Sequence, residues 1–263
     1  MFNHVTLKLN SPLAVNKVYT VTTNSVTDCA GNIIGSKNSA RVGLSSVADS
    51  FDIVINEILF NPNPGGVDYV EIYNRSLKII DAKQLYIANR NSTNVISSIQ
   101  QLSNESILLF PGDFLVLTED PQIVKQQYVT TNPDASLQLS NMPSFPDDKG
   151  DAIILNTQGK IVDEVAYSDK WHFALIANIE GVALERIDYN AASVQNNFHS
   201  AATSVRYGTP GYKNSQFRID QQVQGEINVT PEIFSPDNDG IDDFATINYS
   251  FPSPVYVANI TIY

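Results

Sequence analysis

Short apolar runs, separated by clusters of Asn, Asp, Gly, Pro and Ser, recur along the whole chain. The runs are rich in Val, Ile, Tyr, Phe and Thr, which favour strands, whereas the residues between them favour turns. They lie at residues 5–9, 18–23, 53–60, 69–74, 106–110, 113–119, 152–156, 161–167, 245–251 and 255–263. This pattern predicts an all-β fold of the sandwich or small-barrel type.

Two of these runs also predict which side chains share a face. In residues 69–74, Tyr69, Glu71 and Tyr73 share one face of a strand, and Val70 and Ile72 share the other. Residues 114–117 are apolar on both faces, which predicts a strand in the interior of a sheet.

Two local elements carry specific end signals. Residues 120–129 form the one segment with a helical pattern, with Asp120 as the N-cap and Pro121 at the first helical position, where its missing N–H costs nothing. Residues 156–159 separate two apolar runs and end in Gly159, which can adopt a positive φ. They predict a β-hairpin.

Changes in composition divide the chain into three parts. Small, polar and turn residues replace the apolar pattern near residues 43–51 and again near residues 208–225. The predicted domains are residues 1–45, 50–215 and 226–263. Because the two flanks are too short for independent sandwiches, they are interpreted as the closing part of one domain and the opening part of another.

Charge narrows the classes of partner. Lys and Arg total 16 against 28 Asp and Glu, which gives a formal net charge of −12. Such a chain repels phosphate backbones and anionic membranes, so nucleic acid is not an expected partner. No run approaches the length of a membrane span, and the first residues lack the pattern of a signal peptide. Either the protein is cytoplasmic or its targeting segment lies outside this chain.

The single cysteine cannot form an internal disulfide. No basic residue stands beside Cys29 to favour a thiolate. It is interpreted as a small structural residue at the end of a strand.

Five motifs in the middle of the chain occur in the order typical of one family. They lie at residues 53–76, 109–120, 145–172, 181–188 and 196–215. Together they resemble the lamin tail domain, an immunoglobulin-fold module, over residues 50–215. The one departure is Phe198, where bacterial members commonly carry Trp. The resemblance implies an immunoglobulin-like β-sandwich with no catalytic residues to transfer.

Both flanks also resemble bacterial modules. Residues 1–43 are similar to the closing strands of an immunoglobulin-like surface domain. Residues 227–251 are similar to the start of an immunoglobulin-like domain found near the C-terminus of exported proteins. These resemblances imply partial β-sandwich flanks and an extracellular or cell-surface location.

Polar residues within or beside the apolar strands are candidates for chemistry. They are Asn56, Glu57, Asp68, Glu71 and Asn74. Their structural interpretation is that carboxylates and amides cap the backbone donors of loops. The alternative is that Glu57 and Glu71 form an acid/base pair of the kind found in glycosidases. Arg186 is expected to pair with one of these carboxylates.

One acidic turn has the spacing of a cation site. Asp237 and Asp239, the carbonyl of Ile241, and Asp243 could surround a calcium ion, with Gly240 allowing the turn. The spacing is not that of an EF-hand. The open alternative is a solvated acidic turn without an ion.

Signatures of catalysis are missing from the sequence. The chain has three histidines, His4, His172 and His199, and none of the short motifs of metallohydrolases, serine hydrolases or nucleotide-binding proteins. His172, beside Trp171, is interpreted as a packing or hydrogen-bonding residue.

Six aromatic residues could form a stacking platform for sugar rings or a protein contact, or could fill the core. They are Tyr86, Tyr128, Phe145, Tyr167, Trp171 and Tyr189. The first hypothesis is therefore a non-catalytic structural or interaction module of a larger secreted or cell-surface bacterial protein, with a protein or glycan partner. The alternative is a carbohydrate-binding or substrate-targeting accessory domain of an exported hydrolase. An enzyme would require carboxylates or histidines that converge in a cleft.

Overall fold

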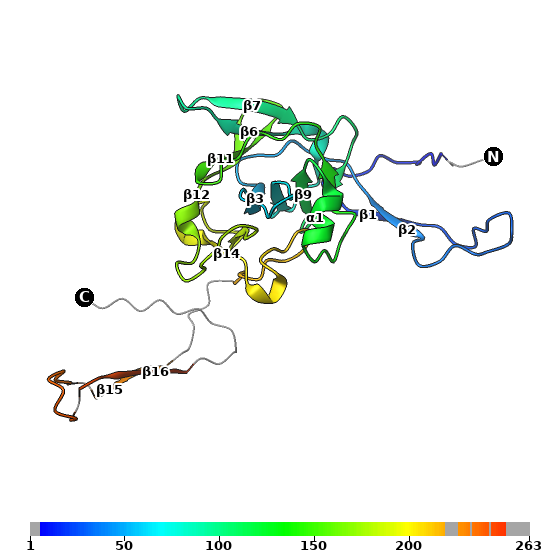
Figure 1. The fold of residues 1–263 in the computed structure, drawn as a ribbon. Coiled ribbons are helices and arrows are strands. Elements are labelled where there is room, and N and C mark those ends of the chain that lie inside the picture. The colour runs from blue at the N-terminus through cyan, green and yellow to red at the C-terminus, as the bar shows by residue number, and fades with distance from the viewer. Residues whose placement is uncertain (1–5, 219–225, 232, 242, 251–263) are drawn as a thin grey trace. The chain divides into compact units, whose positions relative to one another are not determined.

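The computed structural model describes residues 6–218, 226–231, 233–241 and 243–250 (Figure 1). The chain divides into two compact units, Met1–Arg218 and Ile219–Tyr263. The first begins with β1 (Tyr19–Thr22), β2 (Ser39–Val42), β3 (Ile53–Leu59), β4 (Tyr69–Asn74), β5 (Ile80–Asp81), β6 (Leu85–Arg90), β7 (Ile96–Gln101) and β8 (Leu108–Leu109). It continues with β9 (Phe114–Thr118), α1 (Pro121–Gln127), β10 (Ser136–Gln138), β11 (Lys149–Asn156), β12 (Ile161–Ser168), β13 (Leu184–Arg186) and β14 (Phe198–Ser200).

Four short 3₁₀ turns lie among these strands, and the second unit contributes one strand pair. The turns are η1 (Ala82–Gln84), η2 (Asp169–Trp171), η3 (Gln195–Asn197) and η4 (Thr203–Val205). The second unit holds β15 (Glu226–Thr230) and β16 (Thr246–Ser250), which pair antiparallel. The predicted all-β class is confirmed.

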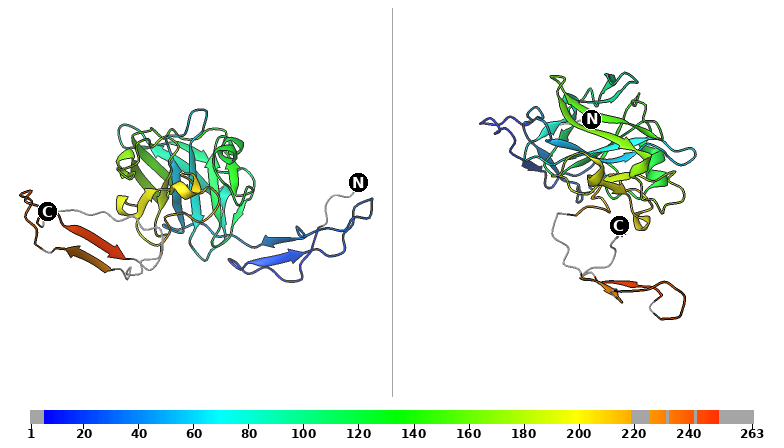
Figure 2. Two further views of the ribbon diagram at one scale, coloured as in Figure 1. Left: turned by 60° about the horizontal axis from the view of Figure 1, so that its bottom comes forward. Right: turned by 90° about the vertical axis from the view of Figure 1, so that its left-hand side faces the viewer.

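Two sheets form the central domain (Figure 2). One has the strand order β10-β9-β4-β3-β13-β14, and the other has the order β12-β11-β6-β7. All neighbours in these sheets are antiparallel except β10 and β9, which are parallel.

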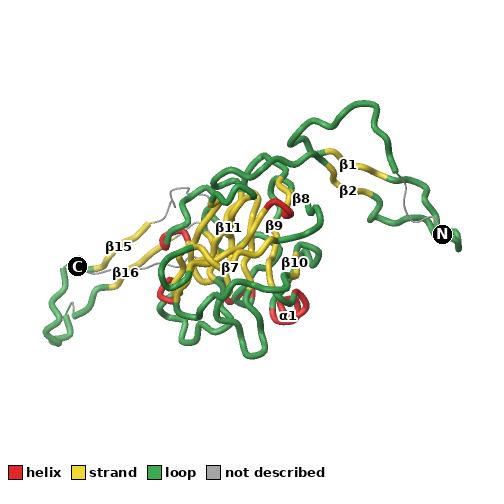
Figure 3. The backbone as a smooth tube through the Cα atoms, turned by 90° about the horizontal axis from the view of Figure 1, so that it is seen from above, coloured by secondary structure: helices red, strands yellow, loops and turns green. Residues whose placement is uncertain are grey.

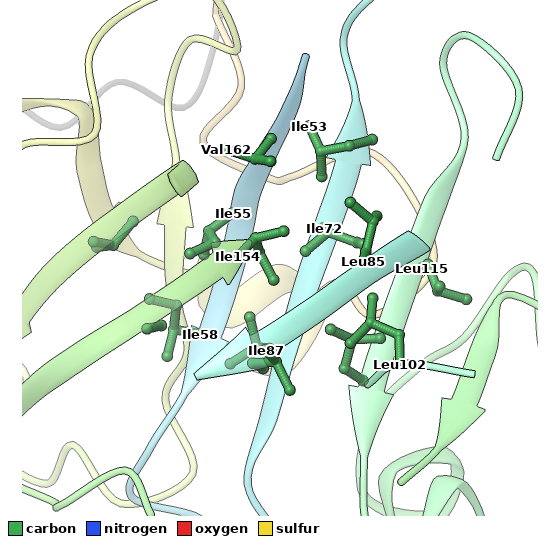
Figure 4. Packing of buried hydrophobic residues seen from close by; sticks show 14 of the residues in the cluster. Ile53, Ile55, Ile58, Ile72, Leu85, Ile87, Leu102, Leu115, Ile154 and Val162 are labelled. Carbon is green, nitrogen blue, oxygen red and sulfur yellow. The ribbon is translucent and has the colours of Figure 1, made fainter. Parts of the chain in front are cut away.

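The main hydrophobic core lies between these sheets. Figure 4 shows strands of one sheet crossing those of the other, with Ile55 and Ile72 facing Ile87 and Ile154. All four side chains are 0% exposed. Burial of such aliphatic side chains stabilises a domain by about 1.5–3 kcal/mol each, which makes this layer the main source of stability.

The predicted faces of β4 and the interior position of β9 are both confirmed. Val70 and Ile72 belong to the main core, whereas Tyr69 packs in a separate cluster on the opposite face of the sheet. β9 has a partner on each side, because β4 and β10 both pair with it.

A β-bulge in β3 changes which of its side chains face the core. The register with β4 shifts between Ile55 and Glu57, so Asn56 has no directly opposed partner. A bulge places two neighbouring residues opposite one on the partner strand. As a result Ile55 and Ile58 face the core, and the two polar residues between them need not.

Both local predictions with end signals are confirmed. The side chain of Asp120 caps α1 by accepting hydrogen bonds from the N–H groups of Gln122 and Ile123, and Pro121 stands at the helix start. β11 and β12 form the predicted hairpin, with Gly159 at φ 72°.

Three predicted strands differ from the structure or lie outside it. Residues 6–9 form no strand, and Leu7 and Leu9 are exposed, so no sheet stabilises that run. Only Leu108–Leu109 of the run at 106–110 pairs, because Ser106 and Ile107 donate hydrogen bonds to the Asp81 carboxylate instead. The run at 255–263 lies outside the described residues.

Each flank holds a two-stranded antiparallel sheet, β1 with β2 and β15 with β16 (Figure 3). Arg41 of β2 forms an ion pair with Asp113, at 2.8 Å, and lies over the ring of Phe110. Among the described residues, no helix has the length and apolar character needed to cross a membrane.

Candidate functional site

Three glutamates form a row across the six-stranded sheet. Glu57 of β3 lies directly opposite Glu71 of β4 on one side and Glu185 of β13 on the other. All three are 0% exposed. Like charges directly opposite each other destabilise a sheet, and buried charges without partners cost far more. This acid row (Glu71, Glu57 and Glu185) therefore depends on its hydrogen-bond partners.

The segment after β14 supplies most of those partners. Residues 206–217, called the strap, cross the acid row on the outer face of the sheet. Thr209 of the strap donates its N–H to Glu57 Oε1, at 2.9 Å, and Gly211 donates its N–H to Glu71 Oε2. Gln216 donates its N–H to Glu185 Oε2, at 2.8 Å. Each glutamate thus binds one backbone N–H of the strap.

Side chains complete the network around the row. The hydroxyl of Tyr69 donates to Glu57 Oε1, at 2.5 Å, and the hydroxyl of Ser215 donates to Glu185 Oε2, at 2.7 Å. Asn56, the bulge residue, donates to Glu71 Oε1 and to the side-chain oxygen of Asn214. Asn214 in turn donates to the carbonyls of Asn56 and Arg186, which ties the strap to β3 and β13.

The electrostatics of the row favour protonated carboxyls. Burial, together with the nearby Glu185, raises the pKa of Glu57 to about 8, against the hydrogen bonds from Tyr69 and Thr209. Burial and Glu57 raise the pKa of Glu71 well above its ordinary value. Burial also raises the pKa of Glu185. In all three glutamates, hydrogen bonds from neighbouring donors oppose the shift.

This geometry decides between the two interpretations of the polar strand residues. An acid/base pair in a glycosidase must reach both a sugar and water. The carboxyl oxygens of Glu57 and Glu71 instead accept hydrogen bonds from the N–H groups of Thr209 and Gly211, and neither glutamate is exposed. The capping role is confirmed for both glutamates. It is also confirmed for Asn74, whose side chain accepts from the N–H of Ser76 and donates to two carbonyls.

Asp68 does not join this row. Burial raises its pKa to about 7, and the nearby Asp147 and Glu119 add to the shift. Its carbonyl accepts a hydrogen bond from the Thr118 hydroxyl.

The predicted pairing of Arg186 with one of these carboxylates is wrong. Arg186 is 0% exposed and binds Asp163 of β12, at 2.9 Å. It also donates to the carbonyl of Ile55 and the hydroxyl of Ser193. Burial raises the pKa of Asp163, and Arg186 and Ser193 oppose that shift. Arg186 and Glu185 are neighbours in one strand and point to opposite faces, so Arg186 cannot serve the acid row.

The acidic turn between β15 and β16 brings three of its predicted ligands together. One carboxylate oxygen from each of Asp237, Asp239 and Asp243 lies within 4.8 Å of the others. The carboxylates also bind the turn's own backbone, since Asp243 accepts from the N–H groups of Asn238 and Gly240. Ile241, the fourth predicted ligand, donates its N–H to Asp239.

Core filling is the main role of the six aromatic candidates. Tyr128, Phe145, Tyr167 and Tyr189 are buried, and Tyr86 and Trp171 are half-buried. A different group clusters at one end of the outer face. Tyr73, Phe114 and Phe217 are half-buried and surround Tyr189, with ring centroids of Tyr73 and Phe217 at 4.1 Å and 4.3 Å from it.

The remaining titratable candidates have structural surroundings. His172 is buried with Nδ1 2.9 Å from the Ser200 hydroxyl, and burial lowers its pKa to about 4, so it is neutral at pH 7. The packing interpretation of His172 is confirmed. His199 is half-buried and packs on Phe173, and His4 lies outside the described residues. Cys29 is exposed in a turn between β1 and β2, so its predicted position at the end of a strand is wrong.

Sequence reasoning missed Glu185 of the acid row, Asp163 of the buried ion pair, and the strap residues that bind the row. Asp163 interrupts the apolar run of a predicted strand, and that interruption is a signal that could have identified it. Glu185 lies in the motif at residues 181–188, outside the predicted strands. Thr209 and Asn214 stand in a polar, turn-rich stretch where no local pattern separates them from solvent-exposed residues.

Comparison with protein families gives a match. The family model described as Lamin Tail Domain matches residues 46–169. The chain finds no match among curated proteins. The matched segment ends before β13, β14 and the strap, yet β13 pairs with β3 in the same sheet and the strap binds β3 and β4. The predicted family and its immunoglobulin-like β-sandwich are confirmed.

Proposed function

Because residues 46–169 of the chain are a lamin tail domain, we propose that the chain is a non-catalytic structural and interaction module. The module belongs to a larger bacterial protein that is secreted or displayed at the cell surface. It spaces or anchors the neighbouring parts of that protein, or contacts a protein partner. An immunoglobulin-like domain of this family is consistent with a non-catalytic role.

The closed state of the acid row is the observation that carries this proposal. Glu57 and Glu71 are the acid/base pair that the sequence offers, and both are 0% exposed. Their oxygens bind Tyr69, Asn56 and the strap. A substrate could reach them only if the strap left the sheet, which would break these hydrogen bonds. The polar residues therefore support a role in holding the domain together.

Surface display can be tested through the one cysteine of the chain. Cys29 is exposed and single within the 263 residues. A membrane-impermeant maleimide should label it in intact cells that produce the larger protein, as strongly as in lysed cells. The Cys29→Ser variant is the matched control, because it removes only the label attributable to this chain. Labelling of Cys29 that requires lysis would contradict the cell-surface proposal.

The alternative, a carbohydrate-binding accessory domain, has one specific surface to test. Tyr73, Phe114 and Phe217 are half-buried aromatics at one end of the outer face, and the ammonium of Lys213 lies 4.3 Å from the Phe217 ring centroid. Aromatic rings are common platforms for sugars. The chain should be applied to a glycan array with and without millimolar calcium. Absence of binding to any glycan supports the structural module, whereas specific binding that Phe217→Ala abolishes would favour the accessory domain.

We also propose that the acidic turn binds calcium, because Asp237, Asp239 and Asp243 bring their carboxylates together. Calcium prefers about six to eight oxygen ligands, so water and carbonyls such as that of Ile241 would complete the set, and the affinity should be weak, near millimolar. Calorimetric titration of the chain with calcium should give heat that Asp239→Asn abolishes. A titration of the wild-type chain without heat would contradict this proposal.

A further inference from the structure

The hydroxyl of Thr209, in the strap, contacts two carboxyl oxygens of the acid row but carries only one proton. The Oγ1 of Thr209 lies 2.8 Å from Glu57 Oε2 and 2.8 Å from Glu185 Oε1. A threonine hydroxyl carries one proton and can donate it to one of these oxygens only. If both carboxylates were ionised, the other contact would join two oxygens without a proton, in a site that excludes water. One of the two glutamates must therefore donate to Thr209.

The position of each glutamate in the row indicates which one carries this proton, because their other oxygens are equally satisfied. Glu185 Oε2 accepts from Ser215 and Gln216, and Glu57 Oε1 accepts from Tyr69 and the N–H of Thr209. Glu57 lies between two other carboxyls, whereas Glu185 has one carboxyl neighbour and His199 of β14 at the next register position. A central carboxyl with like charges on both sides is the one that gains most from being neutral.

No lysine or arginine in the described part of the chain faces the row, and the two cations of the strap, Arg206 and Lys213, are exposed. The titratable groups that face it are the glutamates themselves, His199 at the edge, and four tyrosines. The tyrosines are Tyr69 of β4, Tyr128 at the end of α1, Tyr189 after β13 and Tyr212 of the strap. Arg186, the nearest cation in the sequence, binds Asp163 on the opposite side of the sheet.

We propose that Glu57 is protonated in the folded domain and that its proton closes a latch, in which Glu57 donates to Thr209, Thr209 donates to Glu185, and the strap is held on the sheet. When Glu57 loses the proton, the Thr209 hydroxyl faces two carboxylates and the strap is released. The latch therefore opens as the pH rises. The raised pKa of Glu57, about 8, agrees with this direction.

The latch deepens the proposed structural role and rests on it. The strap ends at Phe217, one residue before Arg218, the last residue of the first unit, and so it lies where the chain leaves that unit. Pulling force reaches a spacer domain through the segments at its two ends. A strap that detaches at high pH would therefore lengthen the connection to the following segment.

Hydrogen exchange of the full chain tests the latch. Between the ordinary pKa of a glutamate and about pH 8, the closed state binds one more proton than the open state, so the open fraction should rise about tenfold per pH unit. After correction for intrinsic exchange rates, the amides of Thr209, Gly211 and Gln216 should show this slope. The amides of β11 report global opening and should exchange more slowly. A slope of zero, or exchange of the strap at the rate of β11, would overturn the latch.

Matched variants separate the proton from the structure. In Glu57→Gln, the amide N–H₂ can donate to Thr209 as the protonated carboxyl does, so the strap should stay closed. The open fraction of the strap should then lose its roughly tenfold rise per pH unit. Glu180→Gln changes an exposed glutamate and should leave the slope unchanged. An unchanged slope in Glu57→Gln would overturn the assignment of the proton.

A second measurement does not depend on a variant that folds. NMR titration of the wild-type chain, with the glutamate carboxyl carbons labelled and assigned, should show that the Glu57 carboxyl titrates far above the ordinary range. A Glu57 carboxyl that titrates near its ordinary value would refute the latch. Neither result depends on glycan binding or surface labelling, so failure of the latch and failure of the proposed function can be told apart.

Discussion

The described residues include two groups of three acidic side chains, the acid row and the acidic turn, whose surroundings differ. The acid row lies on three adjacent strands, is 0% exposed, and takes its donors from the strap. The acidic turn lies within residues 237–243, and Asp237 and Asp239 are exposed. Its carboxylates bind backbone N–H groups of the turn itself.

This difference shows that burial and the source of the donors decide what a carboxylate does. In the turn, the side chains of Asp237 and Asp239 are exposed to water and can be reached by a cation. In the row, water is excluded, and two of the glutamates share one hydroxyl. The row therefore needs a proton where the turn could accept a metal ion.

The largest effect is expected from removing Arg186. Among the described residues, Asp163 is the one buried carboxylate that forms an ion pair, and Arg186 is its partner. Arg186→Met leaves Asp163 buried and unpaired, which should lower the free energy of unfolding by about 3–5 kcal/mol. Chemical denaturation of the chain measures this loss. The control is Arg90→Met, which breaks the more exposed pair with Glu164 and should cost about 1 kcal/mol or less. Equal losses would contradict the importance of burial.

The next effect is a dependence of stability on pH that the acid row should impose. The folded-state pKa of Glu57 is about 8, above its ordinary value of 4.5. A raised pKa means that the folded state holds the proton more tightly. The stabilisation is thus complete below the ordinary value and is lost as the pH rises through the folded-state pKa. From about pH 6 to about pH 8, the unfolding constant should rise about fiftyfold, or about 2 kcal/mol.

Denaturation curves at a series of pH values check this dependence, and Glu57→Gln should flatten it. Glu71 and Glu185 have pKa shifts in the same direction and should leave part of the slope. If stability rose over this range, the row would have to be ionised in the folded domain, and the contrast with the acidic turn would fail.

A smaller effect is expected from removing the shared hydroxyl alone. Thr209→Val keeps the shape of the side chain and leaves Glu57 Oε2 and Glu185 Oε1 without their common partner. The loss should be about 1–3 kcal/mol, the cost of unsatisfied buried polar groups. Thermal or chemical unfolding measures it. Thr203→Val, at an exposed position before the strap, should have little effect, and a similar loss there would indicate a propensity effect of valine.

The smallest effect on the central domain should come from the acidic turn. Asp239→Asn removes one charge from an exposed turn of the second unit and should leave the unfolding of the lamin tail domain unchanged. The same variant should lose any response of the chain to calcium. A change in the pH dependence of the central domain would show that the two carboxylate groups are coupled.

Local rules were sufficient wherever the decisive interactions lie within a few residues of each other. The alternating faces of β4, the Asp120 cap of α1 and the turn at Gly159 each depend on neighbouring residues, and the sequence predicted all three. The five ordered motifs likewise identified the lamin tail domain.

The tertiary structure decided the roles of the charged residues, because their partners come from distant parts of the chain. A simple alternation in β3 would place Glu57 with Ile55, and the bulge at Asn56 breaks that alternation. Thr209, which binds Glu57, follows it by 152 positions, and Arg186 meets Asp163 from a strand in the other sheet. Periodicity reports which face of a strand is apolar, but the partner of a buried charge is fixed only when the sheets and the strap pack together.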